Sequence, residues 1–212
     1  MIKINEIFYS IQGESSHAGR PCVFVRFSGC NLQCSYCDTG YAREEGKSFP
    51  LHQVLEKVVS YGCSLVEITG GEPLLQPEAP VLIEQLLDQG YEVIVETNGT
   101  RDIGEIDSRA CRILDLKCPG SGQSESVRWE NLKKLSPKDE VKFVILNRDD
   151  YEWAGSVVQE YGLAGCVQVL FSPVCGKLSP SALSEWILED RLPVRLQLQL
   201  HKYIWPAKTR GV

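Results

Sequence analysis

Residues 29–39 read Gly29-Cys30-Asn31-Leu32-Gln33-Cys34-Ser35-Tyr36-Cys37-Asp38-Thr39. Three cysteines stand there at the spacing C-x3-C-x2-C, with no fourth cysteine close behind. Cysteine thiolates are the usual ligands of iron–sulfur clusters. A four-iron cluster held by only three thiolates keeps one iron without a protein ligand, and an open position on a bound metal is where chemistry can take place. The stretch therefore predicts a 4Fe–4S cluster with one open iron.

Two other interpretations of these cysteines stay open. The thiols could be reduced side chains of a surface loop, although exposed thiols are reactive. They could also bind zinc, but zinc takes four ligands, and the paired C-x2-C…C-x2-C of a zinc ribbon is absent. We favour the open-iron cluster, because it needs three thiolates and no fourth.

The composition is that of an ordinary soluble globular protein. The 212 residues are 43% hydrophobic and 24% charged, and this length suits a single domain over residues 1–212. No apolar run approaches the roughly 20 residues of a membrane span. The formal net charge of −6 is unlike the basic surface expected for nucleic-acid binding. We therefore expect partners other than membranes and nucleic acid.

Cysteine usage bears on the cellular compartment. The chain has nine cysteines, an odd number that cannot pair completely. The first residues, 1–5, lack the apolar core of a secretory signal. Nine cysteines in an unsecreted chain favour metal ligation in a reducing compartment over a disulfide scaffold. We expect a cytoplasmic protein, and cysteine spacing alone gives no role to the six cysteines outside the motif.

Apolar periodicity predicts alternating strands and helices. Helices are expected from Leu51 and over residues 80–89 and 180–188. Strands, several of them running into polar turns, are expected over residues 2–11, 22–28, 64–69, 91–100, 111–121, 140–146, 166–171 and 194–200. Alternation after residue 51 is typical of a parallel βα array with ligand sites at the carboxyl ends of the strands. About six such units are too few for a closed eightfold barrel. We therefore expect an α/β fold, an incomplete TIM-like (β/α) barrel that is open at the side.

Three motifs resemble those of known families. The C-x3-C-x2-C spacing is similar to the signature of the radical S-adenosylmethionine (SAM) enzymes. Downstream, Gly70-Gly71-Glu72-Pro73 resembles the motif that binds the SAM amino group in that superfamily, and glycines at a strand end allow close approach to the backbone. Ser10-Ile11-Gln12-Gly13-Glu14 resembles the substrate loop of the 7-carboxy-7-deazaguanine synthases. The likeness to that family covers nearly the full length.

The resemblance implies an activity, cofactors and partners. In that family 6-carboxy-5,6,7,8-tetrahydropterin is rearranged to 7-carboxy-7-deazaguanine with loss of ammonia, in the biosynthesis of queuosine and other 7-deazapurines. A cluster on Cys30, Cys34 and Cys37 would supply the electron that cleaves SAM. The resulting 5′-deoxyadenosyl radical abstracts hydrogen from the carbon that bears the carboxylate. The resemblance also implies Mg²⁺, a homodimer, and an external one-electron reductant such as flavodoxin or ferredoxin.

The resemblance further assigns residues to the site. Thr39 would be the protein ligand of Mg²⁺, an ion that prefers oxygen. Glu14 and His201 are candidates to assist a proton step, and no side chain has a certain catalytic role. Substrate contacts fall on Ile11, Gln12, Gly13, Arg26, Thr69, His201 and Pro206. SAM contacts fall on Tyr36, Cys37, Asp38, Gly71, Glu72, Glu96, Asn98, Asp115, Leu116, Lys117, Ser172, Pro173, Val174 and Cys175.

Arg26 has a physical reason for its place in that set. It lies in the apolar run 22–28, which ends at the cysteine motif. A guanidinium near a mostly buried site favours a carboxylate partner, because its planar fork can donate two parallel hydrogen bonds. The resemblance accordingly implies that Arg26 lies at the carboxylate of the substrate.

The chain departs from the family pattern in three places. Ser15 stands where the family usually has glycine, and Asp115-Leu116-Lys117 stands where it reads Ser-Pro-Lys. Some members end at the proline that matches Pro206, whereas this sequence continues for six more residues.

Two other functions stay open at this point. The chain could be a radical SAM activase that places a glycyl radical on a large partner enzyme, although the Gln12-Gly13 loop and Arg26 suit a small carboxylated ring. It could also be a non-enzymatic iron–sulfur electron carrier, although a carrier has no need of a SAM motif at residues 70–73. Copurification with a large partner would favour the first, and failure to consume SAM would favour the second.

Overall fold

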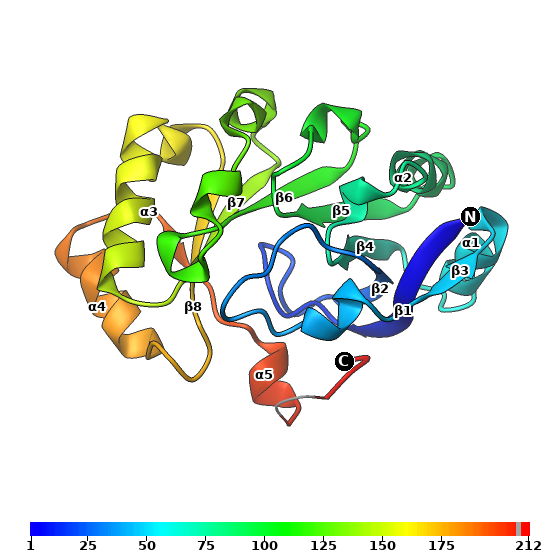
Figure 1. The fold of residues 1–212 in the computed structure, drawn as a ribbon, viewed down its shortest axis with the longest axis horizontal. Helices are drawn as coiled ribbons and strands as arrows, with labels where there is room; N and C mark the ends of the chain where they lie inside the picture. The colour runs from blue at the N-terminus through cyan, green and yellow to red at the C-terminus, as the bar shows by residue number, and fades with distance from the viewer. Residues whose placement is uncertain (207–208) are drawn as a thin grey trace.

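The computed structural model describes residues 1–206 and 209–212, which form a curved sheet with most of the α-helices along its outer side (Figure 1). The described residues form nine strands: β1 (Ile2–Ile11), β2 (Pro21–Phe27), β3 (Lys47–Phe49), β4 (Leu65–Gly70), β5 (Glu92–Thr97), β6 (Cys111–Leu116), β7 (Glu140–Ile145), β8 (Gln168–Pro173) and β9 (Arg195–Leu196). The α-helices are α1 (Leu51–Val59), α2 (Ala79–Asp88), α3 (Arg148–Glu160), α4 (Pro180–Glu189) and α5 (His201–Ile204). Short 3-10 helices lie in the connections: η1 (Gly40–Arg43), η2 (Pro73–Leu75), η3 (Ile103–Glu105), η4 (Pro119–Ser121), η5 (Ser124–Ser126), η6 (Trp129–Lys134) and η7 (Leu163–Gly165).

Strand direction divides the sheet into two parts. The strand order is β3-β1-β2-β4-β5-β6-β7-β8-β9. β1 runs antiparallel to β2 and β3, whereas every neighbouring pair from β2 to β9 is parallel. Within the described ranges, β3 and β9 are the two ends of the sheet, so the sheet does not close on itself. This arrangement confirms the expected open, incomplete (β/α) barrel.

The outer face of the parallel strands holds the main core. Side chains alternate between the two faces of a strand, so every second residue points outward. On β4 these are Val66 and Ile68, which are fully buried. They belong to one apolar cluster with residues of the covering helices, among them Val54, Val58, Leu82, Ile83, Leu86, Ala154, Val158 and Leu183. Burial of these helix faces fixes the helices against the strands and leaves the inner face of the sheet for other uses.

On several strands, β4 among them, the inner face changes from apolar to polar along the strand. On β4 the inward residues are Leu65, Glu67 and Thr69, in that order. The early position belongs to a second, small apolar cluster formed by Phe8, Cys22, Phe24, Leu65, Ile94 and Ile113. The charged and polar residues that follow lie nearer the carboxyl ends, where the connecting loops leave the sheet. The strand pattern itself therefore gathers charge at that end of the molecule.

Two expectations from the sequence are wrong in detail. Of the strand predicted over residues 194–200 only β9 forms: Gln197 N still donates to Phe171 O, but Leu200 N donates to Gly13 O and the chain turns into α5. The connections from β5 to β6 and from β6 to β7 contain 3-10 helices where alternation predicted α-helices. Asp102 accepts a hydrogen bond from Gly104 N at the start of η3, a local contact that favours a short turn.

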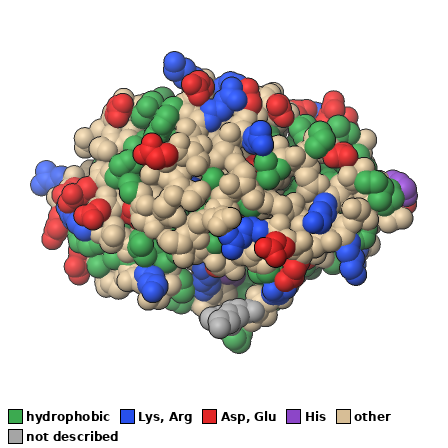
Figure 2. All heavy atoms as spheres, viewed as in Figure 1, with side chains coloured by type: hydrophobic (Ala, Val, Ile, Leu, Met, Phe, Trp, Pro, Cys, Tyr) green, Lys and Arg blue, Asp and Glu red, His purple; other side chains and the backbone are tan. Residues whose placement is uncertain are grey.

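The helices within residues 1–206 and 209–212 include none that is long and apolar enough to cross a membrane. On the face of the molecule drawn in Figure 2, basic and acidic side chains are interspersed.

Candidate active site

The cysteine motif forms a loop that follows β2 and crosses the carboxyl ends of the parallel strands. Two contacts tie the loop to those strands. Glu72 N, just after β4, donates to Gly29 O at 2.8 Å, and Tyr36 Oη donates to Val144 O of β7 at 3.0 Å. Gly29 has φ +97°, a conformation that glycine adopts without strain. The loop is therefore anchored on both sides of the inner face.

Cys30, Cys34 and Cys37 are free thiols that line one cavity. Burial raises the pKa of Cys30 and of Cys34, and the Lys117 ammonium opposes the rise in both. Among the described residues, no three His, Cys, Asp or Glu side chains converge as ligands of a single ion. In a 4Fe–4S cluster each thiolate binds a different iron, so convergence on one point is not needed. The three thiols fit such a cluster better than they fit a zinc ion.

The Gly70-Gly71 turn lies directly against this loop. A Cβ placed on Gly71 would stand 2.0 Å from Gly29 O and 2.9 Å from Cys30 Cβ. Real side chains do not approach a backbone oxygen so closely, and this oxygen already accepts the bond from Glu72 N. The absence of a side chain at Gly71 is thus a requirement of the loop that carries the first cysteine.

Gly71→Ala is expected to displace the cysteine loop and to lower the affinity for SAM roughly 5- to 150-fold, the effect of about 1–3 kcal/mol of overpacking. Equilibrium binding of SAM to the cluster-loaded protein measures it. Gly165→Ala is the matched control, because a Cβ there would meet nothing within 4 Å. An unchanged affinity in Gly71→Ala would contradict the steric argument.

Glu72 does not reach the cavity. It is fully buried, and its Oε1 accepts from Leu74 N at 3.0 Å and from Thr97 Oγ1 at 2.8 Å. Its Oε2 accepts from Asn98 N at 2.7 Å. These bonds join the end of β4 to the end of β5. Glu72 therefore fixes the position of Gly71 and Asn98, which do line the cavity.

The cavity has a volume of about 290 Å³ and lies on the inner side of the sheet. This is near the lower end of the range for small-molecule sites. One wall is formed by the Gln12-Gly13 loop and α5. Leu200 N donates to Gly13 O at 2.9 Å, and a Cβ on Gly13 would stand 2.3 Å from His201 Nδ1. The glycine thus allows the His201 ring to lie against the loop.

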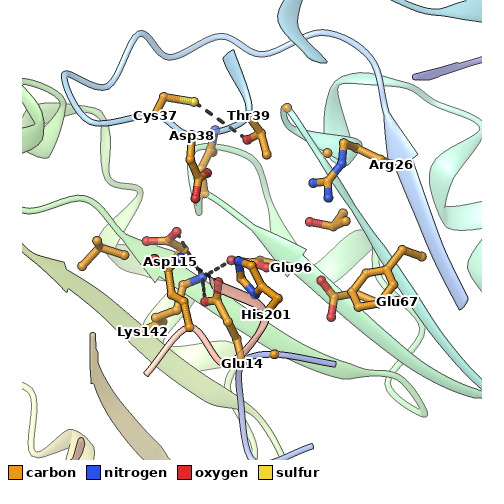
Figure 3. A pocket seen from close by; sticks show the side chains of 18 of the residues that line it. Glu14, Arg26, Cys37, Asp38, Thr39, Glu67, Glu96, Asp115, Lys142 and His201 are labelled. Carbon is orange, nitrogen blue, oxygen red and sulfur yellow. Dashed lines mark hydrogen bonds and ion pairs between the residues drawn. The ribbon is translucent and has the colours of Figure 1, made fainter. Parts of the chain in front are cut away.

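A buried lysine joins the acids at the base of the cavity. Lys142 Nζ donates to Glu14 Oε2 at 2.9 Å and to Glu96, and it lies 3.6 Å from Asp115 Oδ2 (Figure 3). Burial alone would raise the pKa of Glu14, but Lys142 and His201 outweigh it and lower that pKa to about 2. Burial would likewise lower the pKa of Lys142, yet the surrounding carboxylates raise it well above its usual value. Glu14 and Lys142 are therefore both charged at neutral pH.

Glu67 has the opposite character. Its pKa is raised well above the usual value, first by burial and then by the carboxylates of Glu96 and Glu14. Gln12 Nε2 donates to Glu67 Oε2, and Gln12 Oε1 accepts from Glu14 N at 3.0 Å. The cavity therefore combines an ionised carboxylate, Glu14, with a carboxyl group, Glu67, that favours its protonated form.

The structure brings most of the residues assigned from the sequence to this cavity. Those that line it are Ile11, Gln12, Gly13, Glu14, Arg26, Cys30, Cys34, Tyr36, Cys37, Asp38, Thr39, Thr69, Gly71, Glu96, Asn98, Asp115, Lys117, Val174, Cys175 and His201. Those placed elsewhere are Glu72, Leu116, Ser172, Pro173 and Pro206. The side chain of Leu116 points to the outer core, and Pro206 is exposed. Val212 lines the cavity.

Sequence reasoning missed several residues of the cavity. Glu67 stands two positions before Thr69 in the same strand, and Lys142 interrupts an apolar run, so a charged residue at an inward strand position was the available signal. Lys202 Nζ donates to Asp38 Oδ2 at 2.6 Å and joins α5 to the cysteine loop. No sequence pattern pointed to this pair.

Asp115 provides a further test of whether the cavity fits SAM. Its Oδ2 accepts from Lys117 Nζ at 2.7 Å, but its buried Oδ1 has no hydrogen-bond partner among the described residues. A buried acceptor of this kind on the cavity wall favours a ligand that carries N–H or O–H donors. SAM carries both, so the wall fits the cofactor that the cysteine motif suggests.

Comparisons with known proteins agree with this geometry. A model of the Radical SAM superfamily matches residues 24–120. The 7-carboxy-7-deazaguanine synthase of Chlorobaculum tepidum is 44% identical over 100% of this chain and 97% of its own. The enzyme of the same name from Koribacter versatilis is 43% identical over 100% of both chains. Among solved structures, QueE from Escherichia coli covers 94% of each chain with a TM-score of 0.78 at 21% identity, a likeness of fold.

Proposed function

This chain belongs to the 7-carboxy-7-deazaguanine synthase family of radical SAM enzymes, and from that premise we propose that it converts 6-carboxy-5,6,7,8-tetrahydropterin to 7-carboxy-7-deazaguanine with loss of ammonia. The observation that carries the proposal is one cavity lined by the three free cysteines, by Arg26 and by the ionised Glu14. A carboxylated ring with N–H donors matches these groups in charge and hydrogen-bonding type. A plain electron carrier has no need of such a cavity.

The family uses a 4Fe–4S cluster and SAM, and the residues of the cavity fit both. Cys30, Cys34 and Cys37 would hold the cluster, and Gly71 with Asp115 would hold SAM. When bound and reduced, these groups would supply the radical chemistry that removes a hydrogen atom from the substrate. The protein itself contributes binding and orientation.

The chain's own residues would orient the pterin. Arg26 would bind its carboxylate, and the backbone of Gln12 and Gly13 would lie along the ring. Glu14, held ionised, would accept hydrogen bonds from ring N–H groups. His201 favours its neutral form, because burial lowers its pKa although Glu14 opposes the shift. We place any proton transfer at Glu14 or His201, the titratable pair on this wall.

Five further properties belong to the proposal. Mg²⁺ would bind beside Thr39, whose Oγ1 lies 3.9 Å from Cys37 Sγ at the cavity. A reductant such as flavodoxin or ferredoxin would deliver electrons at the loop of the exposed Cys37. The protein would be a cytoplasmic homodimer built from one domain per chain. Support for the compartment comes from the nine cysteines, all of them free.

The test is an anaerobic turnover assay. The cluster is reconstituted and reduced, SAM, Mg²⁺ and 6-carboxy-5,6,7,8-tetrahydropterin are added, and 7-carboxy-7-deazaguanine is sought by mass spectrometry. Formation of that product supports the proposal. Release of 5′-deoxyadenosine without product would overturn the substrate assignment and favour the activase. In the same assay, a loss of binding with unchanged kcat in Glu14→Gln and His201→Asn would exclude a proton-transfer role.

A further inference from the structure

Arg26 is held by a glutamate that the family resemblance did not assign. Arg26 Nε donates to Glu6 Oε1 at 2.8 Å, and Tyr41 Oη donates to the same oxygen at 2.9 Å. The side chains of Arg26 and Glu6 are only 15% and 19% exposed. Figure 3 shows the guanidinium of Arg26 directed into the cavity.

A β-bulge brings Glu6 to this place. Ile2 and Ile4 of β1 are buried in the outer core, so a regular strand would turn Glu6 to that side as well. The pairing of β1 with β2 shifts between Ile4 and Glu6: Ile4 lies opposite Phe27, but Glu6 lies opposite Arg26. The extra residue is Asn5. A bulge re-aims the side chains that follow it, and here it turns Glu6 to the inner face.

The contact uses only one side of the guanidinium. Nε donates to Glu6, whereas Nη1 and Nη2 of Arg26 have no hydrogen-bond or ion-pair partner in the described part of the chain. A second carboxylate can therefore bind the two Nη groups while Glu6 keeps the first. A purely structural ion pair gives no reason for this free donor pair to face a cavity.

We propose that Glu6 is a positioning residue, which the bulge at Asn5 places so that Arg26 presents its two Nη groups to the carboxylate of the substrate. The inference rests on the proposed function, in which Arg26 binds that carboxylate. Without Glu6 the guanidinium is free to turn toward Glu67, which lines the same cavity on the neighbouring strand β4. Carboxylate selectivity would then fall.

The experiment compares two ligands on the cluster-loaded, SAM-bound protein. 6-Carboxypterin carries the carboxylate and pterin lacks it, so the ratio of their dissociation constants, measured by calorimetry, isolates the carboxylate contact. Wild type is expected to prefer 6-carboxypterin. Glu6→Ala is expected to reduce this preference about tenfold, the order of effect of losing one preorganised side chain. Pterin binding should stay unchanged.

Three variants serve as comparisons. Glu6→Gln should keep the preference within about threefold of wild type, because the amide oxygen still accepts from Arg26 Nε. Tyr41→Phe should lower it by about twofold and gives a readout if Glu6→Ala does not fold. Glu56→Ala, an exposed glutamate on α1, should change nothing.

The outcomes separate this inference from the proposed function. Suppose that Arg26→Ala abolishes the preference for 6-carboxypterin. If Glu6→Ala then leaves this preference unchanged, or weakens the binding of both ligands equally, the positioning role of Glu6 is wrong. The premise is that Arg26 binds the substrate carboxylate. It would be wrong if wild type forms product but binds 6-carboxypterin no better than pterin, or if Arg26→Ala keeps the wild-type preference. Either result would overturn the inference about Glu6. Absence of product in the turnover assay is the separate sign that the function itself is wrong.

Discussion

Alanine at Cys30, Cys34 or Cys37 is expected to remove iron and labile sulfide and to reduce product to the level of an enzyme-free sample. The cluster would have only three protein ligands, so the loss of one leaves two. Of the other cysteines, Cys175 also lines the cavity, but it lies after β8 and outside the cysteine loop. Cys118 follows β6 close to the loop, but it is buried in the outer core, and burial raises the pKa of its thiol well above the usual value.

The measurement is iron content and visible absorbance after anaerobic reconstitution, together with the product assay. Cys166→Ala is the matched control, since Cys166 is an exposed free cysteine that does not line the cavity. It should load iron as wild type does. Full loading of Cys34→Ala, or equal loss in Cys166→Ala, would contradict the assignment of the three ligands.

The sequence predicted the parts of this site that are local. The three cysteines, the Gly70-Gly71 turn and the Gln12-Gly13 loop are each contiguous, so a short motif carries them. The open barrel followed from alternation of strand and helix patterns. These features depend on residues that are neighbours in the chain. In the structure, each motif follows the strand after which the sequence pattern predicted it.

The remaining features of the site depend on how the strands align with one another. Lys142 meets Glu14 across 128 positions of sequence, and only the strand register decides that they face each other. The bulge at Asn5 changes which face Glu6 occupies, although the residue pattern around it reads as an ordinary strand. The predicted strand over residues 194–200 ends early, because Leu200 N donates to Gly13 O, which is remote in the sequence, and the chain turns into α5. Long-range polar contacts of this kind override local alternation.

Lys142→Met is expected to lower the free energy of unfolding by about 3–5 kcal/mol at pH 7, because it leaves buried carboxylates without their cation. Lys142 is 6% exposed and meets Glu14, Glu96 and Asp115. Urea denaturation of both proteins in the same cluster-loaded state measures the difference. Lys133→Met, an exposed lysine, is the control and should stay within about 0.5 kcal/mol of wild type.

The pH dependence of the free energy of unfolding identifies the cause of the stability loss in Lys142→Met. In wild type the pKa of Glu14 is about 2, below its ordinary 4.5, so its contribution is present above pH 4.5 and is lost as the pH falls toward 2. Without the Lys142 ammonium, less positive charge opposes the effect of burial on Glu14, and the pKa of Glu14 should rise above 4.5. A raised pKa reverses the sign: the variant regains stability as the pH falls from 7 toward 4.5. The gap between the two proteins should therefore narrow between pH 7 and pH 5.

A double variant separates charge from packing. Lys142→Met removes a cation but keeps a side chain of similar length, so the loss of contacts is small. Adding Glu14→Gln removes one uncompensated carboxylate and should restore part of the lost stability, which makes the two substitutions non-additive. A gap that stays constant from pH 7 to pH 5, with additive effects in the double variant, would assign the loss to packing of the lysine stem. Narrowing and partial rescue together would establish Lys142 as the counter-charge that keeps Glu14 ionised at the base of the cavity.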